Sequence, residues 1–160
     1  MQIKMLVMDV DGTHTDGKIY MGATGEVMKA FDIKDGCGIK DILPTLGITP
    51  VIITARHSQI LGNSCKELNI LEVHQGIRNK LNKLNEICQV KKISLANVAY
   101  IGDDILDLQC MNPVKNEGGI VGCPADAVQT VKDIADFISI KKGGEGAVRD
   151  FIEYLKRTDF

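Results

Sequence analysis

Carboxylates gather at two places where apolar segments end. Asp9 and Asp11 follow the run MLVM, and Asp103, Asp104 and Asp107 follow the run VAYI within GDDILD. Buried carboxylates cost free energy unless a positive charge meets them. A set of oxygen ligands suits a hard divalent cation better than zinc, and Mg²⁺ is commonly held by one or two carboxylates together with substrate phosphate oxygens. These residues therefore predict a magnesium site that serves phosphate chemistry.

Several of these residues also have a simple structural interpretation. Asp104 and Asp107 could cap or charge the first turn of a following helix, where aspartate is favoured. Asp11 precedes a glycine and could belong to a turn. Thr54 could simply end a strand, and Lys80 could be a solvated lysine on a helix surface.

The elements that would position these residues alternate between strands and helices. We expect strands at residues 4–8, 50–54, 98–101, 119–121 and 137–138. We expect helices at residues 39–46, 58–68, 79–88, 105–111, 125–134 and 147–155. This alternation predicts an α/β fold with a doubly wound, mainly parallel, Rossmann-like sheet. Ligands bind such sheets at the carboxyl ends of the strands, where Asp9, Thr54 and Asp103 would meet.

One segment departs from this alternation. KIYMGATGEVMKAFDI has a Gly-Ala-Thr-Gly turn between two β-prone runs and predicts a projecting β-hairpin at about residues 18–31. Its apolar side chains would be exposed on a monomer, so we expect them to be buried against another subunit. Pro44 predicts a kink or an early stop in the helix after the hairpin.

Composition narrows the class of protein. The 160 residues, of which 44% are apolar and 25% charged, predict a single globular domain over residues 1–160. The sequence contains no membrane-length apolar run and no signal peptide, which predicts a cytoplasmic protein without a membrane partner. A net charge of −2 and the lack of a basic stripe argue against nucleic-acid binding. The five scattered cysteines argue against a disulfide framework and a zinc site.

Four segments in order, DVDGT, VIIT, QGIRNK and GDDILD, resemble the motifs of the haloacid dehalogenase-like phosphatases. The resemblance implies that Asp9 is a nucleophile that forms an aspartyl-phosphate. It implies that Asp11 protonates the leaving oxygen and then activates water, and that Thr54 and Lys80 bind the phosphoryl oxygens. Such a mechanism needs the phosphate charge to be neutralised, which a cation and an ammonium can do.

The same resemblance implies a set of metal ligands. Mg²⁺ would be held by Asp9, by the backbone carbonyl of Asp11 and by Asp103, with Asp104 and Asp107 in supporting roles. The intervals between Asp11, residue 54 and Asp103 are too short to hold a separate cap domain. Another part of the assembly must therefore cover the substrate.

A closer resemblance extends over nearly the whole chain. DVDGTHTDGKIYMGATGEVMKAFDIKDGCGIK, ITARHSQILGNSCKELNI, HQGIRNK, NVAYIGDDILDL and GGEGAVRDFIEYL are similar to the capless 3-deoxy-D-manno-octulosonate 8-phosphate phosphatases, enzymes of lipopolysaccharide biosynthesis. The resemblance implies a phosphorylated keto sugar acid as substrate and a homotetramer that the hairpins help to assemble. It also implies that a C-terminal tail, about residues 141–160, closes the active site of a neighbouring subunit.

Cationic and flexible residues suggest how the sugar acid would be held. Arg56 could pair with a carboxylate in a bidentate manner, and Arg78 lies two residues before Lys80. Gly144 has a permissive backbone that could approach a ligand, and Arg149 could meet an anion. The alternative for each is a solvated charge or a plain flexible linker.

Departures from the family pattern concern the substrate more than the chemistry. Thr13-His14 replaces the usual small apolar pair, Ala55 stands where glycine usually precedes the arginine, and CPADA resembles phosphatase segments linked to acylneuraminate activation. Close relatives act on nine-carbon keto acid 9-phosphates of the sialic-acid type, and Arg56 favours the octulosonate. The competing classes are a phosphotransferase or mutase and a non-catalytic binding module.

Overall fold

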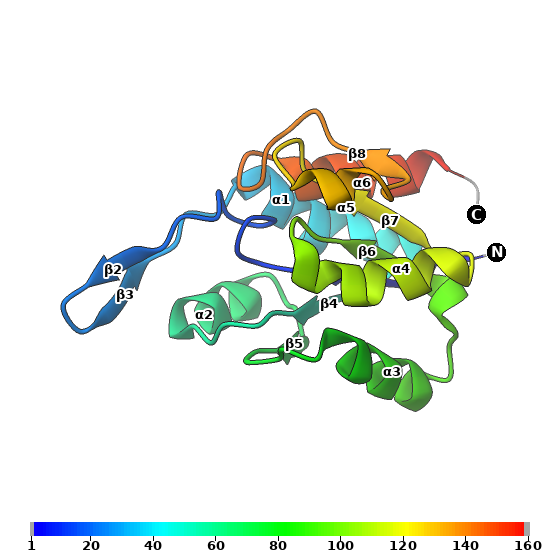
Figure 1. Ribbon diagram of the computed structural model, residues 1–160, viewed down its shortest axis with the longest axis horizontal. Helices are drawn as coiled ribbons and strands as arrows, with labels where there is room; N and C mark the ends of the chain where they lie inside the picture. Colours follow the sequence, from blue (N-terminus) through cyan, green and yellow to red (C-terminus); the bar gives the residue numbers. More distant parts are fainter. Residues whose placement is uncertain (1, 159–160) are drawn as a thin grey trace.

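The computed structural model describes residues 2–158 and contains a six-stranded parallel sheet in the order β5-β4-β1-β6-β7-β8 (Figure 1). The strands are β1 (Met5–Met8), β4 (Thr49–Ile53), β5 (Glu72–His74), β6 (Val98–Ile101), β7 (Ile120–Cys123) and β8 (Phe137–Ile138). Strand β1 pairs with β4 on one side and with β6 on the other. The winding direction reverses at β1, so a ligand is expected at the carboxyl ends of β1 and β6.

Helices cover both faces of this sheet. They are α1 (Ile33–Cys37), α2 (Gln59–Glu67), α3 (Lys80–Lys91), α4 (Leu108–Asn116), α5 (Gln129–Lys132) and α6 (Ala147–Arg157). Leu6 and Met8 face α2, α6 and the turns after α1, whereas Met5 and Val7 face α3, α4 and α5. A parallel sheet buried on both faces needs strands that are apolar throughout, which explains the run MLVM. The predicted α/β, doubly wound, Rossmann-like sheet is confirmed.

The last helix belongs to the chain's own core. Phe151 is fully buried, and a Cβ atom at Gly122 of β7 would lie 2.7 Å from its ring. Phe137 of β8 stacks on Phe151 and on Tyr154, with ring centroids 5.7 and 4.6 Å apart. Burying one such side chain stabilises a fold by about 1.5–3 kcal/mol. The segment predicted to be a tail is therefore mostly a core helix, and its last two residues lie outside the described part of the chain.

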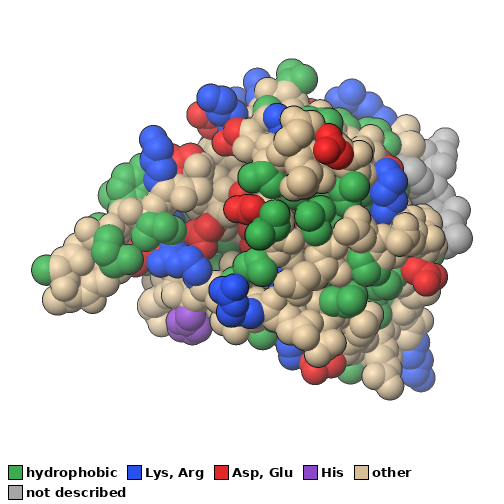
Figure 2. Space-filling model, in the orientation of Figure 1, with side chains coloured by type: hydrophobic (Ala, Val, Ile, Leu, Met, Phe, Trp, Pro, Cys, Tyr) green, Lys and Arg blue, Asp and Glu red, His purple; other side chains and the backbone are tan. Residues whose placement is uncertain are grey.

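The hairpin forms as the sequence predicts. Strands β2 (Tyr20–Gly22) and β3 (Gly25–Met28) pair antiparallel and project away from the main sheet (Figure 1). Apolar side chains lie along this arm (Figure 2). Met21 and Val27 are 61% and 60% exposed. The prediction of a projecting hairpin is confirmed.

The segment after the hairpin differs from its prediction. The helix expected at residues 39–46 begins earlier as α1, because the Asp32 side chain accepts a hydrogen bond from the Lys34 N–H and caps the first turn. It continues as a π-helical turn, Gly38–Ile42, and a 3-10 turn, Leu43–Leu46. Pro44 lies at the start of the 3-10 turn, so the predicted irregularity is present as a change of helix type.

Two further differences lie at the edges of the sheet. Strand β5 was not predicted, because it has only three residues, fewer than the roughly four to eight over which alternation of apolar and polar side chains indicates a strand. The helix expected at residues 125–134 is reduced to α5, because the chain first turns through a hydrogen bond from the Ala127 N–H to the Pro124 carbonyl. The other predicted helices and strands match the observed ones to within a few residues, with α4 continuing through Pro113 to Asn116.

The connections leave the strand ends uncovered by any inserted domain. Residues 12–53 form the hairpin, α1, the two turns and β4, and residues 55–102 form α2, β5, α3 and β6. Within residues 2–158, no helix is both long enough and apolar enough to cross a bilayer.

Candidate active site

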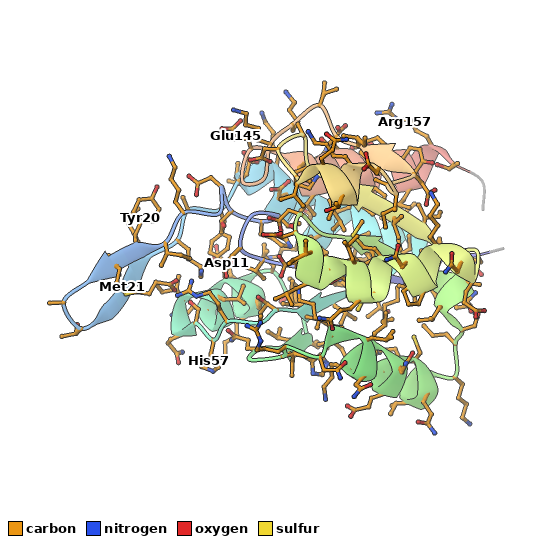
Figure 3. The ribbon with its side chains drawn as sticks, in the orientation of Figure 1. Asp11, Tyr20, Met21, His57, Glu145 and Arg157 are labelled. Carbon is orange, nitrogen blue, oxygen red and sulfur yellow. The ribbon has the colours of Figure 1, made fainter. Side chains whose placement is uncertain are left out.

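A cleft of about 380 Å³ lies at the carboxyl ends of the central strands. It is lined by Asp9, Asp11, Thr54, Ala55, Arg56, Arg78, Lys80, Asp104, Ile105, Leu106 and Asp107. Eight of these eleven, all except Ala55, Ile105 and Leu106, are site residues that the sequence predicted. Asp11 lies where the base of the hairpin meets the body of the protein, so the hairpin flanks one side of the site (Figure 3).

Asp9 and Lys80 form the buried centre of this cleft. The backbone N–H of Asp9 donates to the Ile101 carbonyl at 3.1 Å, so pairing of β1 with β6 carries Asp9 into the site. Lys80 is the first residue of α3, and its side chain is 2% exposed. Its Nζ lies 2.8 Å from Oδ1 of Asp9 and 2.8 Å from Oδ1 of Asp107. Burial lowers the pKa of Lys80, but the two carboxylates raise it by a larger amount. The net pKa is therefore above the ordinary value, and the side chain is an ammonium.

Asp107 organises the site through both of its carboxylate oxygens. Its Oδ1 accepts from Lys80 and from the Tyr100 hydroxyl at 2.8 Å, and its Oδ2 accepts from the backbone N–H groups of Asp103 and Asp104 at 2.9 and 3.2 Å. These bonds fix the loop after β6 and leave little capacity for a metal. Asp104 is exposed and accepts from the Ile105 N–H at 2.7 Å, which is the capping role considered as its alternative.

Asp9 and Asp103 are the carboxylates best placed to hold a cation. One oxygen from each of Asp9, Asp103 and Asp107 lies within 4.8 Å of the others. Burial first, and then the neighbouring carboxylates, raise the pKa of Asp9 to about 6 and that of Asp103 to about 9. A divalent cation relieves such crowding of negative charge, and the all-oxygen set fits Mg²⁺. The contribution of the Asp11 backbone carbonyl stays a prediction.

The loop after Asp11 is shaped around Asp103. Gly12 has a φ of +92°, and a Cβ atom there would lie 2.0 Å from Oδ2 of Asp103, so only glycine fits. The Thr13 hydroxyl donates to Oδ1 of Asp103 at 3.1 Å. Thr13, which departs from the family pattern, therefore orients a predicted metal ligand.

The side chain of Asp11 belongs to a network that the sequence did not reveal. Its Oδ1 accepts from the Lys29 ammonium at 2.6 Å, and the Arg56 guanidinium lies 3.8 Å away. Glu26 binds both cations at 3.0 Å and accepts from the Ser58 hydroxyl at 2.7 Å. Lys29, Glu26 and Ser58 lie outside the four short motifs, and only the fold of the hairpin brings them together at the strand ends.

Thr54 and the two predicted arginines line the cleft at different depths. Thr54 is buried, and its N–H donates to the His74 carbonyl at 3.0 Å, which fixes the end of β4 against β5. Arg56 is half-buried and Arg78 is exposed. None of the three histidines of the chain lines the cleft.

Gly144 and Arg149 do not line the cleft of their own chain. The Gly144 N–H donates to the Thr13 carbonyl at 3.3 Å, so the glycine-rich turn packs against the loop after Asp11. The Arg149 guanidinium donates to Glu153 at 2.9 Å, and its backbone N–H donates to Asp35 at 2.8 Å. Their expected contribution to a neighbouring site stays a prediction.

The cysteines are free thiols. Cys65, Cys88, Cys110 and Cys123 are buried and Cys37 is exposed. Burial raises the pKa of Cys65 and of Cys123 to about 11 and that of Cys110 to about 12, so these three are poor nucleophiles.

Comparison with known proteins agrees with this geometry. The model of the haloacid dehalogenase-like hydrolase family matches residues 42–152. The 3-deoxy-D-manno-octulosonate 8-phosphate phosphatase KdsC of Salmonella typhi is 39% identical over 153 residues, which cover 96% of this chain and 79% of the relative. The corresponding phosphatase of Yersinia pestis is 37% identical over the same shares of the two chains.

Solved structures of octulosonate 8-phosphate phosphatases are also similar to this chain. The Yersinia pestis phosphatase superimposes with a TM-score of 0.89 at 38% identity, covering 96% of this chain and 80% of that one. The Moraxella catarrhalis phosphatase, solved with a magnesium ion, a phosphate ion and a KDO molecule, gives 0.88 at 37% identity, covering 96% and 85%. The chain therefore belongs to the haloacid dehalogenase-like hydrolases, in the family of the 3-deoxy-D-manno-octulosonate 8-phosphate phosphatases.

Proposed function

We propose that this protein is a Mg²⁺-dependent phosphatase that hydrolyses 3-deoxy-D-manno-octulosonate 8-phosphate through an aspartyl-phosphate on Asp9. The observation that carries the proposal is the convergence of Asp9, Asp11, Thr54 and Lys80 in one cleft at the carboxyl ends of β1, β4 and β6. The Moraxella catarrhalis relative, which binds magnesium, phosphate and KDO, supports the choice of metal and substrate.

The first half of the reaction transfers the phosphoryl group to Asp9. Because Oδ1 of Asp9 is held by Lys80, its other oxygen is free to attack phosphorus. The bond from phosphorus to the sugar oxygen breaks, and Asp11 gives a proton to that oxygen. Lys80 and Thr54 stabilise the charge on the phosphoryl oxygens. Held by Asp9 and Asp103, Mg²⁺ would neutralise part of the negative charge of the phosphate.

The second half of the reaction restores the enzyme. A water molecule attacks phosphorus, Asp11 takes the proton of that water, and the bond from phosphorus to Asp9 breaks. Inorganic phosphate leaves, and Asp9 returns as a carboxylate beside Lys80. Asp11 needs one oxygen that can reach both the leaving group and the water, and its place on the cleft wall fits that need.

The cations of the cleft fit a sugar acid. Arg56 binds Glu26 through Nη1 and keeps its other N–H groups for a ligand carboxylate. Arg78 adds a second exposed cation on the same cleft wall. An eight-carbon keto acid phosphate would place its phosphate beside Lys80 and its carboxylate towards these arginines.

A phosphate-release screen tests this proposal. Purified protein with Mg²⁺ should release phosphate from octulosonate 8-phosphate with a higher kcat/KM than from a nine-carbon keto acid 9-phosphate. The reverse preference would assign the sialic-acid type of substrate and keep the chemistry. Transfer of the phosphoryl group to a second sugar would indicate a phosphotransferase, and an inert protein would indicate a binding module.

We also propose that the protein assembles as a homotetramer through its hairpins. Ile19, Tyr20, Met21, Val27 and Met28 are exposed on the arm, and a second copy could bury them (Figures 2 and 3). In sedimentation, the wild type should have the mass of a tetramer, and Met21→Glu with Val27→Glu should lower that mass. A monomeric wild type at assay concentration contradicts this part of the proposal.

The proposed role of the C-terminal segment is confined to its exposed turn. Because α6 packs on the sheet of its own chain, a neighbouring site could be reached by the turn at residues 141–146, where Lys141, Lys142 and Glu145 are exposed. Alanine at the two lysines should then lower turnover of the sugar phosphate more than turnover of a small phosphate ester. Equal effects on both esters contradict that role.

Residues 1–160 are proposed as one phosphatase domain in the cytoplasm. One six-stranded sheet contains strands from β1 to β8, with the hairpin strands β2 and β3 outside it, and the five free thiols fit a reducing compartment.

A further inference from the structure

The base of the hairpin carries a buried ammonium group. Lys29 directly follows β3, and its side chain is 3% exposed. Its Nζ lies 2.6 Å from Oδ1 of Asp11 and 3.0 Å from Oε2 of Glu26. A buried charge is costly unless it is paired and hydrogen-bonded, so this position is built around the two carboxylates.

Glu26 joins the hairpin to the segment between β4 and α2. Its Oε2 accepts from Arg56 at 3.0 Å and its Oε1 accepts from Ser58 at 2.7 Å, in addition to the ion pair with Lys29. Burial raises the pKa of Glu26, but these three donors together lower it by a larger amount, so its net pKa is below the ordinary value. Glu26 is therefore a carboxylate that holds Lys29 and Arg56 in fixed positions.

This arrangement assigns different tasks to the two oxygens of Asp11. Oδ1 is occupied by Lys29, with Arg56 at 3.8 Å, whereas no hydrogen bond or ion pair from residues 2–158 holds Oδ2. We propose that Lys29 is a positioning residue, which Glu26 holds in place and which turns Oδ2 of Asp11 towards the leaving oxygen. This inference rests on the proposed function, because it takes Asp11 as the acid of the first step. The proton moves from Oδ2 of Asp11 to the sugar oxygen, and Lys29 keeps its own protons.

A role limited to anchoring the hairpin is the main alternative. The two roles differ in how the effect depends on the leaving group. An alkoxide leaves slowly without a proton, whereas p-nitrophenolate leaves readily without one. Loss of positioning should therefore lower kcat/KM for an alkyl phosphate more than for an aryl phosphate. Loss of an anchor should lower both by the same factor.

The experiment compares kcat/KM for β-glycerol phosphate and p-nitrophenyl phosphate in five proteins with Mg²⁺. These are the wild type, Lys29→Met, Lys29→Arg, Asp11→Asn and Lys66→Met, the last of which changes an exposed lysine of α2. In Lys29→Met the alkyl-to-aryl ratio should fall about tenfold, a part of the 10²–10⁴ that general acid catalysis contributes. Lys29→Arg should restore most of the ratio because it keeps the charge, and Lys66→Met should match the wild type.

The outcomes separate this inference from the proposed function. If Asp11→Asn lowers the ratio and Lys29→Met does not, the positioning role is wrong and the phosphatase mechanism stands. If Asp11→Asn leaves the ratio unchanged, the acid role of Asp11 fails, and the inference fails with it. Circular dichroism shows whether Lys29→Met folds. If it does not fold, Glu26→Gln carries the test, because it keeps the shape of the side chain and removes the charge that holds Lys29. An unchanged ratio in Glu26→Gln would then overturn the inference.

Discussion

The ammonium of Lys80 lies 2.8 Å from the carboxylate of Asp9, although the two residues are 71 positions apart in the sequence. Strand β1 delivers Asp9, and the first turn of α3 delivers Lys80, so the sheet and the helix together set this distance. In the proposed reaction the pair places a nucleophile and a charge-neutralising group against the same phosphate. Changes at these two positions should therefore affect chemistry and stability differently.

Replacement of the nucleophile should remove turnover and keep the fold. In Asp9→Asn the amide cannot form the phosphoenzyme, whereas Lys80 still has Asp107 as a partner. We expect no steady-state phosphate release above background and a circular dichroism spectrum like that of the wild type. Sustained hydrolysis by a sequence-verified preparation of this variant would remove Asp9 from the role of nucleophile.

Replacement of the acid and base should lower turnover without removing it. Asp11→Asn keeps a hydrogen-bond acceptor for Lys29 but has no proton to give, so we expect kcat to fall by roughly 10²–10⁴. Steady-state assays with octulosonate 8-phosphate measure this loss. A change smaller than about threefold, far below the range for lost acid–base catalysis, would return Asp11 to the role of a turn residue.

Replacement of the buried lysine should cost stability as well as activity. Lys80→Met leaves Asp9 and Asp107 without their shared cation, and breaking a buried pair in this way costs about 3–5 kcal/mol. Urea denaturation measures the free energy of unfolding. Lys83→Met on the same helix is the matched control, because Lys83 pairs with the exposed Glu86, and such surface pairs contribute about 1 kcal/mol or less. Equal losses in the two variants would contradict the buried role of Lys80.

The site residues that lie at the ends of strands could be predicted from the sequence. Apolar runs that end in Asp9, Thr54 and Asp103 predict strands, and parallel strands bring their carboxyl ends together. Position alone suggested Lys80, which lies between the second and fourth motifs. These residues could be predicted because the regular geometry of the sheet places them.

The missed residues depend on tertiary packing. Lys29 and Glu26 look like solvated charges of a hairpin, and their burial is decided by how the hairpin base meets Arg56 and Ser58. Tyr100 looks like any core residue of β6, but its hydroxyl donates to Asp107. No local pattern encodes such contacts, since each joins segments that are brought together only by the fold.

The glycines of the C-terminal segment show a related limit. The sequence suggested permissive backbones that approach a ligand or form a flexible linker, whereas a Cβ atom at Gly143 would lie 2.0 Å from the Gly12 carbonyl oxygen, so this glycine permits close packing within the chain. The amphipathic pattern of α6 then buries Phe151, Ile152 and Leu155 in the core. A glycine selected for close approach and one selected for flexibility look the same in a sequence.

Metal binding should change how stability depends on pH. In the metal-free protein the pKa of Asp9 is raised to about 6 and that of Asp103 to about 9, from a value of 3.8 for each. A carboxyl group with a raised pKa binds its proton more tightly in the folded state than in the unfolded state. The contribution of these two groups to the free energy of unfolding is therefore greatest at low pH, and it falls as the pH rises through these pKa values.

Thermal melting of the metal-free protein, with and without Mg²⁺, tests this dependence. Mg²⁺ needs the carboxylates in their charged form, so its stabilisation should be larger at about pH 8 than at about pH 5. At 100 times the Kd a ligand adds about 2.7 kcal/mol to the free energy of unfolding, which corresponds to a Tm increase of roughly 5–10 °C for a chain of this size.

Excess chelator should abolish phosphate release, and added Mg²⁺ should restore it. Asp103→Asn is the control and should lose most of the stabilisation by Mg²⁺ and most of the Mg²⁺-dependent phosphate release. Equal Mg²⁺ shifts at the two pH values, or full activity in chelator, would contradict a metal site between Asp9 and Asp103.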